Sequence, residues 1–306
     1  MTDVGQQEFD IAFLGNYTKD TIVSAAGTRV VDGGAFHYGA HVAAAMGLRT
    51  AAITRLARQD WHVVKALANL GVELFVTPTP TSTCLRLEYP SADVDERVIY
   101  VTNTAGAFAP DQVAGVRAQV FVVGASLRGE VSLEVIQALA ARDALLAVDV
   151  QGFVRVAREG KLAYAPWPQK GPVLAQVDIL KTDAVEAEVL TGEKEIHQAA
   201  QRLAELGPPE IVLTYRNGLL VFAHGHFHAA GFFPARLVGR CGRGDTCLAA
   251  YSAKRLTSSP AEATVWAAAV TSLKMEAEGP FRREIAEVED LVRCRYRGRP
   301  GMGEGS

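Results

Sequence analysis

Short apolar runs alternate with amphipathic runs along most of the chain. Residues 9–15 form a first apolar run of strand length, and residues 39–47 form an Ala-rich run of helical character. Strands that alternate with helices predict a mostly parallel sheet covered by helices on both faces. Further strands are predicted at 50–55, 72–76, 120–124, 145–150, 177–181, 211–214 and 218–223, and further helices at 59–70, 131–142, 185–190, 198–206, 246–256 and 260–275. We therefore expect one doubly wound α/β domain over residues 1–300, followed by a disordered tail at 301–306.

Two segments, residues 21–32 and 83–102, depart from this pattern. In both of them apolar and polar residues alternate without a helical period, which predicts strands that expose one face. Pro90 to Asp93 predicts a turn between two of these strands. We expect a small β sheet that stands off the main domain as a lid, built from about residues 16–33 and 80–104.

Composition narrows the class of protein. A chain of 306 residues with 49% hydrophobic content can bury a large core. The net charge is −3 and no long basic run occurs, so the sequence does not predict nucleic-acid binding. The exception is a group of arginines near the C-terminus, which we interpret as part of a solvated tail: Arg293, Arg295, Arg297 and Arg299.

Membrane insertion and secretion are also disfavoured. The most apolar long stretch, residues 261–275, contains polar side chains and is shorter than the roughly 20 apolar residues of a membrane span, so it predicts a buried helix. Residues 1–9 are too polar for a secretion signal. The four cysteines contain no Cys-x-x-Cys pair, which favours reduced thiols in the cytoplasm over a zinc site or a disulfide framework.

A glycine turn between a strand-like region and a predicted helix carries the first chemical signal. Residues 241–246 read Cys-Gly-Arg-Gly-Asp-Thr. Two glycines accept backbone conformations that other residues resist, so several N–H groups can converge where the helix dipole favours an anion. A carboxylate beside a bound anion is useful when it accepts a proton from a hydroxyl that attacks that anion. Asp245 is therefore a candidate general base beside an anion hole at Gly242 to Gly244.

A second interpretation of this turn stays open at this point. Gly-x-Gly-Asp before a helix also describes a plain turn in which Asp245 is the N-cap. A Walker-type loop is excluded because no Gly-Lys-Ser/Thr follows the turn. A dinucleotide fingerprint is disfavoured because the turn lies near the C-terminus and lacks the third glycine.

The chain resembles the ribokinase-like family, also called the PfkB carbohydrate kinases, over about residues 9–283. Its Gly-Arg-Gly-Asp at 242–245 stands where that family has Gly-Ala-Gly-Asp. The resemblance implies that Asp245 is the base that deprotonates the acceptor hydroxyl. It also implies that Gly242, Arg243 and Gly244 form the anion hole for the transferring phosphoryl group.

Further motifs on the implied acceptor side match in order. A strand end is followed by an acceptor-binding aspartate, a di-glycine precedes an Ala-rich helix, and a third strand ends near the family's Asp-x-Asn. The positions that match are Asn16 with Asp20, Gly33 with Gly34, and Gln151 with Arg155.

Two motifs match on the implied phosphate side. One resembles the Asn-x-x-Glu motif that organises magnesium and phosphate, and the other resembles the Thr-x-Gly loop at the nucleotide. The resemblance implies that ATP is held by Lys181, Asp183, Glu186, Thr214 and Gly218, and that Mg²⁺ is held through water by Glu186 and Asp183. Lys274 and Met275 lie where the family lines its nucleotide pocket.

The chain also departs from the family pattern. Arg243 replaces alanine, and a guanidinium there would either pair with a phosphate or acidic substrate group or point to solvent. The asparagine after the di-glycine is absent. We expect residues 35–39 to fill that loop, with His37 as an acceptor contact. Asp183 replaces asparagine in the magnesium motif, and residues 215–217 replace the glycine-bearing part of the nucleotide loop.

Residues 149–155 and 242–247 look closest to the inositol-kinase-like branch of the family. The resemblance then implies an ATP-dependent kinase that phosphorylates a hydroxyl of a cyclitol, such as a myo-inositol-like polyol, or of a sugar or keto-sugar acid. It also implies a homodimer paired through the lid. Two alternatives stay open: a nucleoside or ribose-type kinase of the same fold, and a ligand-binding protein without catalysis.

Overall fold

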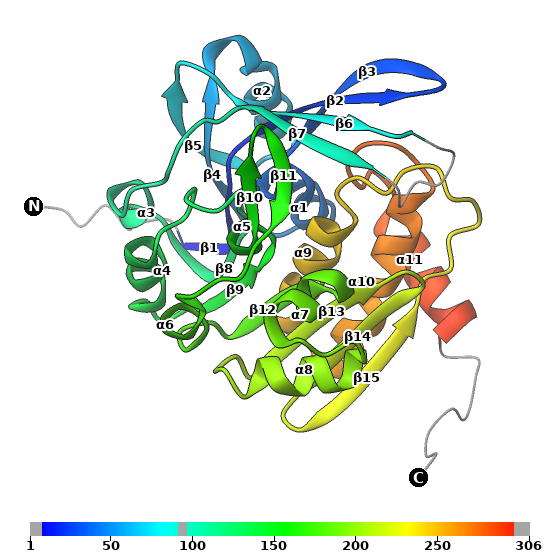
Figure 1. The fold of residues 1–306 in the computed structure, drawn as a ribbon. Helices are drawn as coiled ribbons and strands as arrows, with labels where there is room; N and C mark the ends of the chain where they lie inside the picture. Colours follow the sequence, from blue (N-terminus) through cyan, green and yellow to red (C-terminus); the bar gives the residue numbers. More distant parts are fainter. Residues whose placement is uncertain (1–7, 91–96, 297–306) are drawn as a thin grey trace, which may run out of the picture.

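The computed structural model describes residues 8–90 and 97–296, which form two β sheets with helices packed around the larger one (Figure 1). The larger sheet has nine strands in the order β15-β14-β13-β12-β9-β8-β1-β4-β5. All neighbouring pairs from β13 to β5 are parallel, and β14 and β15 add to this edge antiparallel. The strands are β1 (Glu8–Leu14), β4 (Thr50–Ala57), β5 (Glu73–Thr79), β8 (Arg117–Val123), β9 (Leu145–Asp149), β12 (Ile179–Asp183), β13 (Glu210–Tyr215), β14 (Gly218–Ala223) and β15 (His226–Gly231). This confirms the predicted doubly wound α/β architecture.

Helices cover both faces of the large sheet because successive strand residues point to opposite sides. On β1, Ile11 and Phe13 pack into one core cluster, whereas Ala12 and Leu14 pack into the other. Helices α1, α2, α9, α10 and α11 contribute to the first cluster, and α3 to α8 contribute to the second. Their bounds are α1 (Ala35–Ala45), α2 (His62–Ala68), α3 (Asp111–Ala114), α4 (Leu133–Ala140), α5 (Gln151–Val154), α6 (Lys170–Leu174), α7 (Ala184–Thr191), α8 (Ile196–Ala204), α9 (Arg243–Arg255), α10 (Pro260–Met275) and α11 (Ile285–Leu291).

The observed helix boundaries agree with the predicted ones in one case and differ in another. Helix α10 occupies the predicted residues because Ser259 and Glu262 form a capping box and Pro260 follows the N-cap. The prediction that residues 35–39 form a loop is wrong, because α1 already begins at Ala35. Gly34, with φ 99°, ends the preceding strand and turns the chain directly into the helix.

A second, small sheet has six strands in the order β10-β11-β7-β6-β2-β3. Four of them come from the two segments with period-two alternation: β2 (Thr18–Ser24), β3 (Gly27–Gly33), β6 (Thr83–Glu88) and β7 (Val98–Asn103). The other two, β10 (Arg155–Arg158) and β11 (Lys161–Tyr164), form a hairpin that the sequence analysis did not identify. That this sheet acts as a lid stays a prediction. Residues 91–93 of the expected turn and the expected tail at 301–306 lie outside the described residues.

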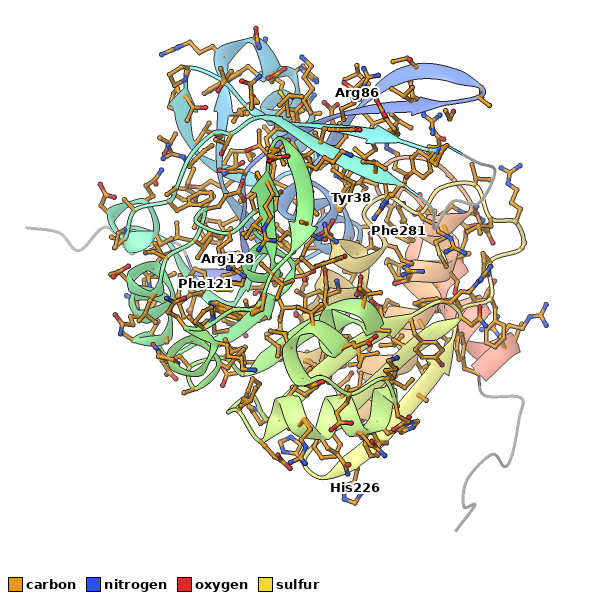
Figure 2. The ribbon with its side chains drawn as sticks, in the orientation of Figure 1. Tyr38, Arg86, Phe121, Arg128, His226 and Phe281 are labelled. Carbon is orange, nitrogen blue, oxygen red and sulfur yellow. The ribbon has the colours of Figure 1, made fainter. Side chains whose placement is uncertain are left out.

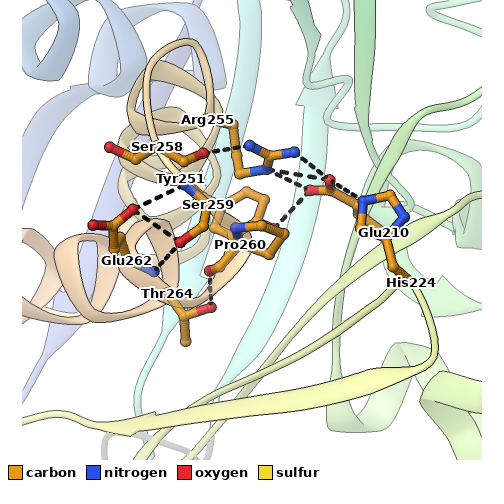
Figure 3. A network of polar contacts seen from close by, with 9 residues as sticks. All are labelled: Glu210, His224, Tyr251, Arg255, Ser258, Ser259, Pro260, Glu262 and Thr264. Carbon is orange, nitrogen blue, oxygen red and sulfur yellow. Dashed lines mark hydrogen bonds and ion pairs between the residues drawn. The ribbon is translucent and has the colours of Figure 1, made fainter.

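A buried polar network holds the carboxyl end of α9 against the large sheet (Figure 3). Glu210, the first residue of β13, accepts hydrogen bonds from Arg255 Nη2 at 2.7 Å and from the Tyr251 hydroxyl at 2.7 Å. Arg255 also donates to the carbonyl of Ser258, just before α10 begins. The network therefore ties α9, α10 and β13 together at the amino end of the strand.

Two general expectations are also tested by the fold. Among the described residues, no helix combines the length and the apolar content that crossing a bilayer requires. Cys84, Cys241, Cys247 and Cys294 are all free thiols.

Candidate active site

The carboxyl ends of the parallel strands open into a cavity of about 720 Å³. The start of α9 and the β7 and β11 strands of the small sheet complete its walls. Clefts at the carboxyl ends of parallel strands are the usual ligand sites of open α/β sheets. The predicted site residues that line this cavity are Gln151, Arg155, Lys181, Asp183, Thr214, Gly242, Arg243, Gly244 and Asp245.

The glycine turn forms the amino end of α9. Gly242 has φ 73° and acts as N-cap, and Thr246 N–H donates to its carbonyl at 2.9 Å. A Cβ on Gly242 would lie 2.3 Å from the Tyr38 ring, and one on Gly244 would lie 2.6 Å from Lys181 Nζ. Position 242 therefore requires glycine, and a side chain at Gly244 would displace the Lys181 ammonium. Arg243 N–H donates to the Arg240 carbonyl at 3.1 Å, so within the first helical turn the N–H groups of Gly244 and Asp245, two residues that line the cavity, are the ones left for an anion.

Asp245 lies in that first turn, beside the cavity. Burial, together with the nearby Asp149 carboxylate, raises the pKa of Asp245 to about 6, while surrounding cations oppose this rise. A carboxylate with this pKa is still ionised at pH 7 and is a stronger base than an ordinary aspartate. Its side chain makes no N-cap contact, because the N-cap is Gly242. The geometry therefore favours the base interpretation over the capping one.

Lys181 occupies the floor of the site. It is 3% exposed, and its Nζ lies 2.9 Å from Asp149 Oδ2 and 4.0 Å from Glu186 Oε2. Burial works against its charge, but the neighbouring carboxylates outweigh burial and raise the pKa of Lys181. The ammonium is therefore permanently charged, directly beneath Gly244.

Glu186 and Asp183 are joined in a capping box at the start of α7. Asp183 N–H donates to Glu186 Oε2 at 3.0 Å, and Glu186 N–H donates to Asp183 Oδ1 at 2.8 Å. The other Glu186 oxygen accepts from Arg155 Nη2 at 3.2 Å. Burial raises the pKa of Glu186, although Lys181 and Arg155 hold it down. Both oxygens of Glu186 are thus engaged, whereas Asp183 reaches the cavity.

The proposed acceptor residues meet at the root of the small sheet. Asn16 Nδ2 donates to the Gly106 carbonyl at 2.9 Å, while Asn16 Oδ1 and Asp20 Oδ1 are buried without a hydrogen-bond partner. Burial raises the pKa of Asp20 to about 6, and the negative charge of Asp245 adds to this rise. A Cβ on Gly33 would lie 3.0 Å from Asp20 Oδ2. The same Cβ would lie 2.4 Å from Thr18 Oγ1, so the pairing of β2 with β3 already requires a glycine at this position.

Seven predicted residues do not line the cavity: Asn16, Asp20, Gly33, Gly34, His37, Glu186 and Gly218. For His37 and Gly218 the structure gives another explanation. His37 is buried in α1 among aromatic rings, with its ring centroid 4.6 Å from that of His41, and burial lowers its pKa to about 3. Gly218 starts β14 where a Cβ would lie 2.4 Å from the Ala230 carbonyl oxygen, so strand pairing explains this glycine. Their roles as acceptor and nucleotide contacts stay predictions without a supporting contact.

Much of the positive charge in the cavity comes from residues that carry no motif in the sequence. Seven of its lining residues are lysine or arginine and two are aspartate, so the cavity favours anionic ligands. The cations that the sequence analysis did not identify are Arg97, Lys161, Arg216 and Arg240. For Lys161 a signal existed: Glu159-Gly160 is a two-residue hairpin turn with φ 49° and 77°.

Comparison with solved structures agrees with this arrangement. A pyrophosphate-dependent kinase in the ribokinase family, complexed with a pyrophosphate analog and myo-inositol, matches with a TM-score of 0.85 and 32% identity over 92% of this chain and 99% of that chain. A pyrophosphate-dependent myo-inositol-1 kinase converted into a myo-inositol-3 kinase matches with a TM-score of 0.84 and 32% identity over 94% and 99%. Ribokinase from Arabidopsis thaliana, complexed with ribose and ATP, matches with a TM-score of 0.74 and 19% identity over 94% and 99%, which shows the fold alone.

Sequence comparisons identify the family of this chain. A search of curated proteins found no match. The family model of the pfkB family carbohydrate kinases matches residues 9–281. That match covers most of the chain, and the kinases described above share its fold and a third of its residues. The chain therefore belongs to the pfkB family of carbohydrate kinases and is a phosphotransferase that acts on a sugar or polyol hydroxyl.

Proposed function

We propose that this enzyme transfers a phosphoryl group from pyrophosphate to a hydroxyl of a cyclitol such as myo-inositol, with Asp245 as the base. The observation that carries the proposal is the cation-lined cavity over the Gly242 to Gly244 turn, with Asp245 at its edge. The kinases at 32% identity described above use pyrophosphate, and one of them was complexed with myo-inositol. ATP remains the second candidate donor because the motif resemblance implies it.

In the region where a nucleotide base was expected, the loop packs onto α10, and a cavity of only about 300 Å³ remains beside it, lined by Val238, Gly239 and Lys274. The N–H groups of Val238 and Gly239 both donate to the Met275 carbonyl, at 2.9 and 3.1 Å, and Ala235 N–H donates to Glu276 Oε1 at 2.7 Å. Met275 is 3% exposed. The loop before the glycine turn is therefore bonded down onto the end of α10, where the family resemblance placed the nucleotide pocket.

In the proposed reaction, the acceptor hydroxyl oxygen attacks the terminal phosphorus as the bond from that phosphorus to the leaving phosphate breaks. The hydroxyl proton passes to Asp245, and the products are a phosphorylated cyclitol and inorganic phosphate. With ATP as donor, the leaving group would be ADP. The first-turn N–H groups of α9, together with Lys181 beneath them, stabilise the charge on the transferring group.

The acceptor would be held by oxygen atoms that lack partners in the described structure. Asn16 Oδ1 and Asp20 Oδ1 are buried acceptors, and a polyol supplies hydroxyl donors to satisfy them. A cyclitol carries hydroxyls around its whole ring, so one face can bind Asp20 while another hydroxyl reaches Asp245. The small sheet would close over this complex and exclude water.

The residues present also fit a magnesium ion bound mainly by donor phosphates and water. Mg²⁺ usually takes one or two carboxylates plus substrate phosphates. Asp183 lines the cavity and would hold the ion, with Glu186 behind it through water because both Glu186 oxygens are engaged. The ion would neutralise phosphate charge.

A matrix of donors and acceptors tests the proposal. Pyrophosphate and ATP are each combined with myo-inositol, a keto-sugar acid, ribose, fructose and a nucleoside, and phosphorylated product is measured by ³¹P NMR, with Asp245→Asn as control. We expect product with pyrophosphate and myo-inositol. Turnover with ATP alone would refute the donor, and turnover of the nucleoside or ribose alone would refute the acceptor. No product from any pair, with ligand binding in calorimetry, would favour a binding protein.

A further inference from the structure

A buried lysine lies behind the glycine turn. Lys274, near the end of α10, is 2% exposed. Its Nζ donates to the carbonyl of Gly239 at 3.3 Å and to the carbonyl of Cys241. The same Nζ lies 5.5 Å from the centroid of the Tyr38 ring, which Figure 2 labels. The ammonium is thus held by two backbone carbonyls and one aromatic face.

This buried environment destabilises a charged ammonium. Burying an ammonium costs several kcal/mol unless strong partners compensate. Asp245 and Glu278 act on Lys274 through charge alone and form no hydrogen bond with it. Carbonyl dipoles and the Tyr38 ring supply only part of the electrostatic stabilisation that a hydrogen-bonded carboxylate would supply. Stability alone therefore does not explain why a lysine occupies this position.

The peptide that Lys274 holds leads directly into the anion hole. The Cys241 carbonyl and the Gly242 N–H belong to one trans peptide unit, in which the two groups point in opposite directions. Because the carbonyl points at Lys274, the Gly242 N–H points away from it. Gly242 lines the cavity, whereas Lys274 does not. A positive charge on the carbonyl also polarises the peptide and strengthens its N–H as a donor.

We propose that Lys274 is a positioning residue for phosphoryl transfer, which fixes and polarises the Cys241–Gly242 peptide so that its N–H is ready for the transferring anion. This inference rests on the proposed function, because it assigns Lys274 to the same anion hole. Lys274 does not line the large cavity in which the donor is proposed to bind; together with Tyr38 and Cys241 it lines a separate cavity of about 300 Å³. Its proposed effect on the donor therefore passes through the Cys241–Gly242 peptide.

The charge on Lys274 gives the proposal a pH signature. Burial lowers the pKa of Lys274 to about 8, and the groups that face it are Tyr38 from α1, Cys241, Arg243 and Asp245 from the turn, and Glu278 after α10. Burial raises the pKa of both Cys241 and Tyr38. The ammonium is therefore lost as the pH rises past about 8, and kcat should fall on that alkaline side.

The test compares Lys274→Met with Lys254→Met as a matched control. Lys254 lies on α9 with its Nζ 4.7 Å from the Trp266 ring of α10, so it bridges the same two helices without touching the turn. Binding of sodium sulfate and of pyrophosphate is measured by calorimetry, and kcat is measured against pH. In Lys274→Met we expect about 10-fold weaker anion binding and a kcat lower by about 10- to 100-fold, less than the loss of a whole oxyanion donor.

Further readouts separate positioning from a structural role. The alkaline fall in kcat should vanish in Lys274→Met, and methylammonium should partly restore Lys274→Ala by occupying the carbonyl site. If Lys274→Met does not fold, Lys274→Gln replaces it, because glutamine keeps N–H donors without the charge. Lys254→Met should match the wild type in anion affinity and kcat.

The proposal is overturned if Lys274→Met, or Lys274→Gln in its place, equals Lys254→Met in sulfate affinity and kcat. It is also overturned if the wild type binds no anion, or if the loss of kcat follows the loss of folded protein without any change in pH profile. If the wild type binds sulfate but phosphorylates no acceptor, the proposed function fails, while the sulfate titration still decides the role of Lys274.

Discussion

Buried polar groups lie at both ends of helix α9, but those at the carboxyl end are hydrogen-bonded and some of those at the amino end are not. At the carboxyl end, Glu210 accepts hydrogen bonds from both Arg255 and Tyr251 (Figure 3). At the amino end, Thr246 Oγ1 and Arg155 Nε are buried without a hydrogen-bond partner in the described structure. One helix thus joins a completed polar network to an incomplete one.

The difference separates stability from binding. An unpaired buried polar group costs about 1–3 kcal/mol, so a fold keeps such groups where a ligand completes them. The carboxyl-end network contributes to stability and offers nothing to a ligand. At the amino end Arg155 lines the cavity and is available to an anion, whereas Thr246 is fully buried and does not line it. Substitutions at the two ends should therefore affect different measurements.

The largest expected effect is at the amino end. Asp245→Asn should lower kcat by about 10²- to 10⁴-fold because the acceptor loses its general base. A raised carboxyl pKa means that the ionised form destabilises the fold at neutral pH, so Tm should stay equal or rise. Steady-state kinetics and thermal unfolding together check this prediction. Near-normal turnover would remove Asp245 from the mechanism.

At the carboxyl end, Glu210→Ala should show the reverse pattern. It leaves Arg255 without its carboxylate and Tyr251 without its acceptor, which should cost about 3 kcal/mol of unfolding free energy. Urea denaturation measures this loss. Activity per folded molecule should stay within about twofold, because the group lies at the opposite end of the strands. A large fall in kcat would show that the two ends are coupled.

The glycine turn gives an intermediate effect. Gly242→Ala places a Cβ against the Tyr38 ring at φ 73°, whereas Gly279→Ala has φ 80° with open space around it. The left-handed backbone alone costs about 1–2 kcal/mol in both variants. The clash should add about 1–3 kcal/mol in Gly242→Ala and displace the anion hole. Equal unfolding free energies in the two variants would contradict the close packing of Tyr38.

The smallest effect concerns pH. Burial raises the pKa of Asp20 and of Asp245 to about 6, and the proposed mechanism uses both as carboxylates. Below about pH 6 both take up protons, so log kcat/KM should fall with a slope near 2 in the wild type. In Asp20→Asn one titrating group is gone, and the slope should be near 1. An unchanged slope would show that Asp20 does not bind the acceptor in its ionised form.

Much of the fold follows from local pattern. The inner strands of the large sheet, such as β1, β9, β12 and β13, are mostly buried on both faces, so each one reads as an apolar run. Residues 260–275 carry both helix signals at their start. The position of Asp245 beside an anion-binding helix end could also be inferred, because two glycines before a helix define that geometry locally.

The rest depends on contacts that no local pattern encodes. The β10 and β11 strands are four residues long and rich in charge, so they lack an apolar run. The cations Arg97, Lys161 and Arg216 come from separate segments and meet only in the folded cavity. The loop expected at residues 35–39 became a helix because Gly34 makes the turn alone.

The central place of β1 has a consequence for biosynthesis. This strand pairs with β4 on one side and β8 on the other, yet it is made first. At roughly 5–20 residues per second, about 5–20 s pass between the synthesis of residue 14 and that of residue 123. During that time the apolar Ile11 to Leu14 has at least one unpaired edge on the nascent chain. An apolar strand with an unpaired edge during synthesis is a general aggregation hazard, and the pairing of β1 with both β4 and β8 removes it only once β8 has been made.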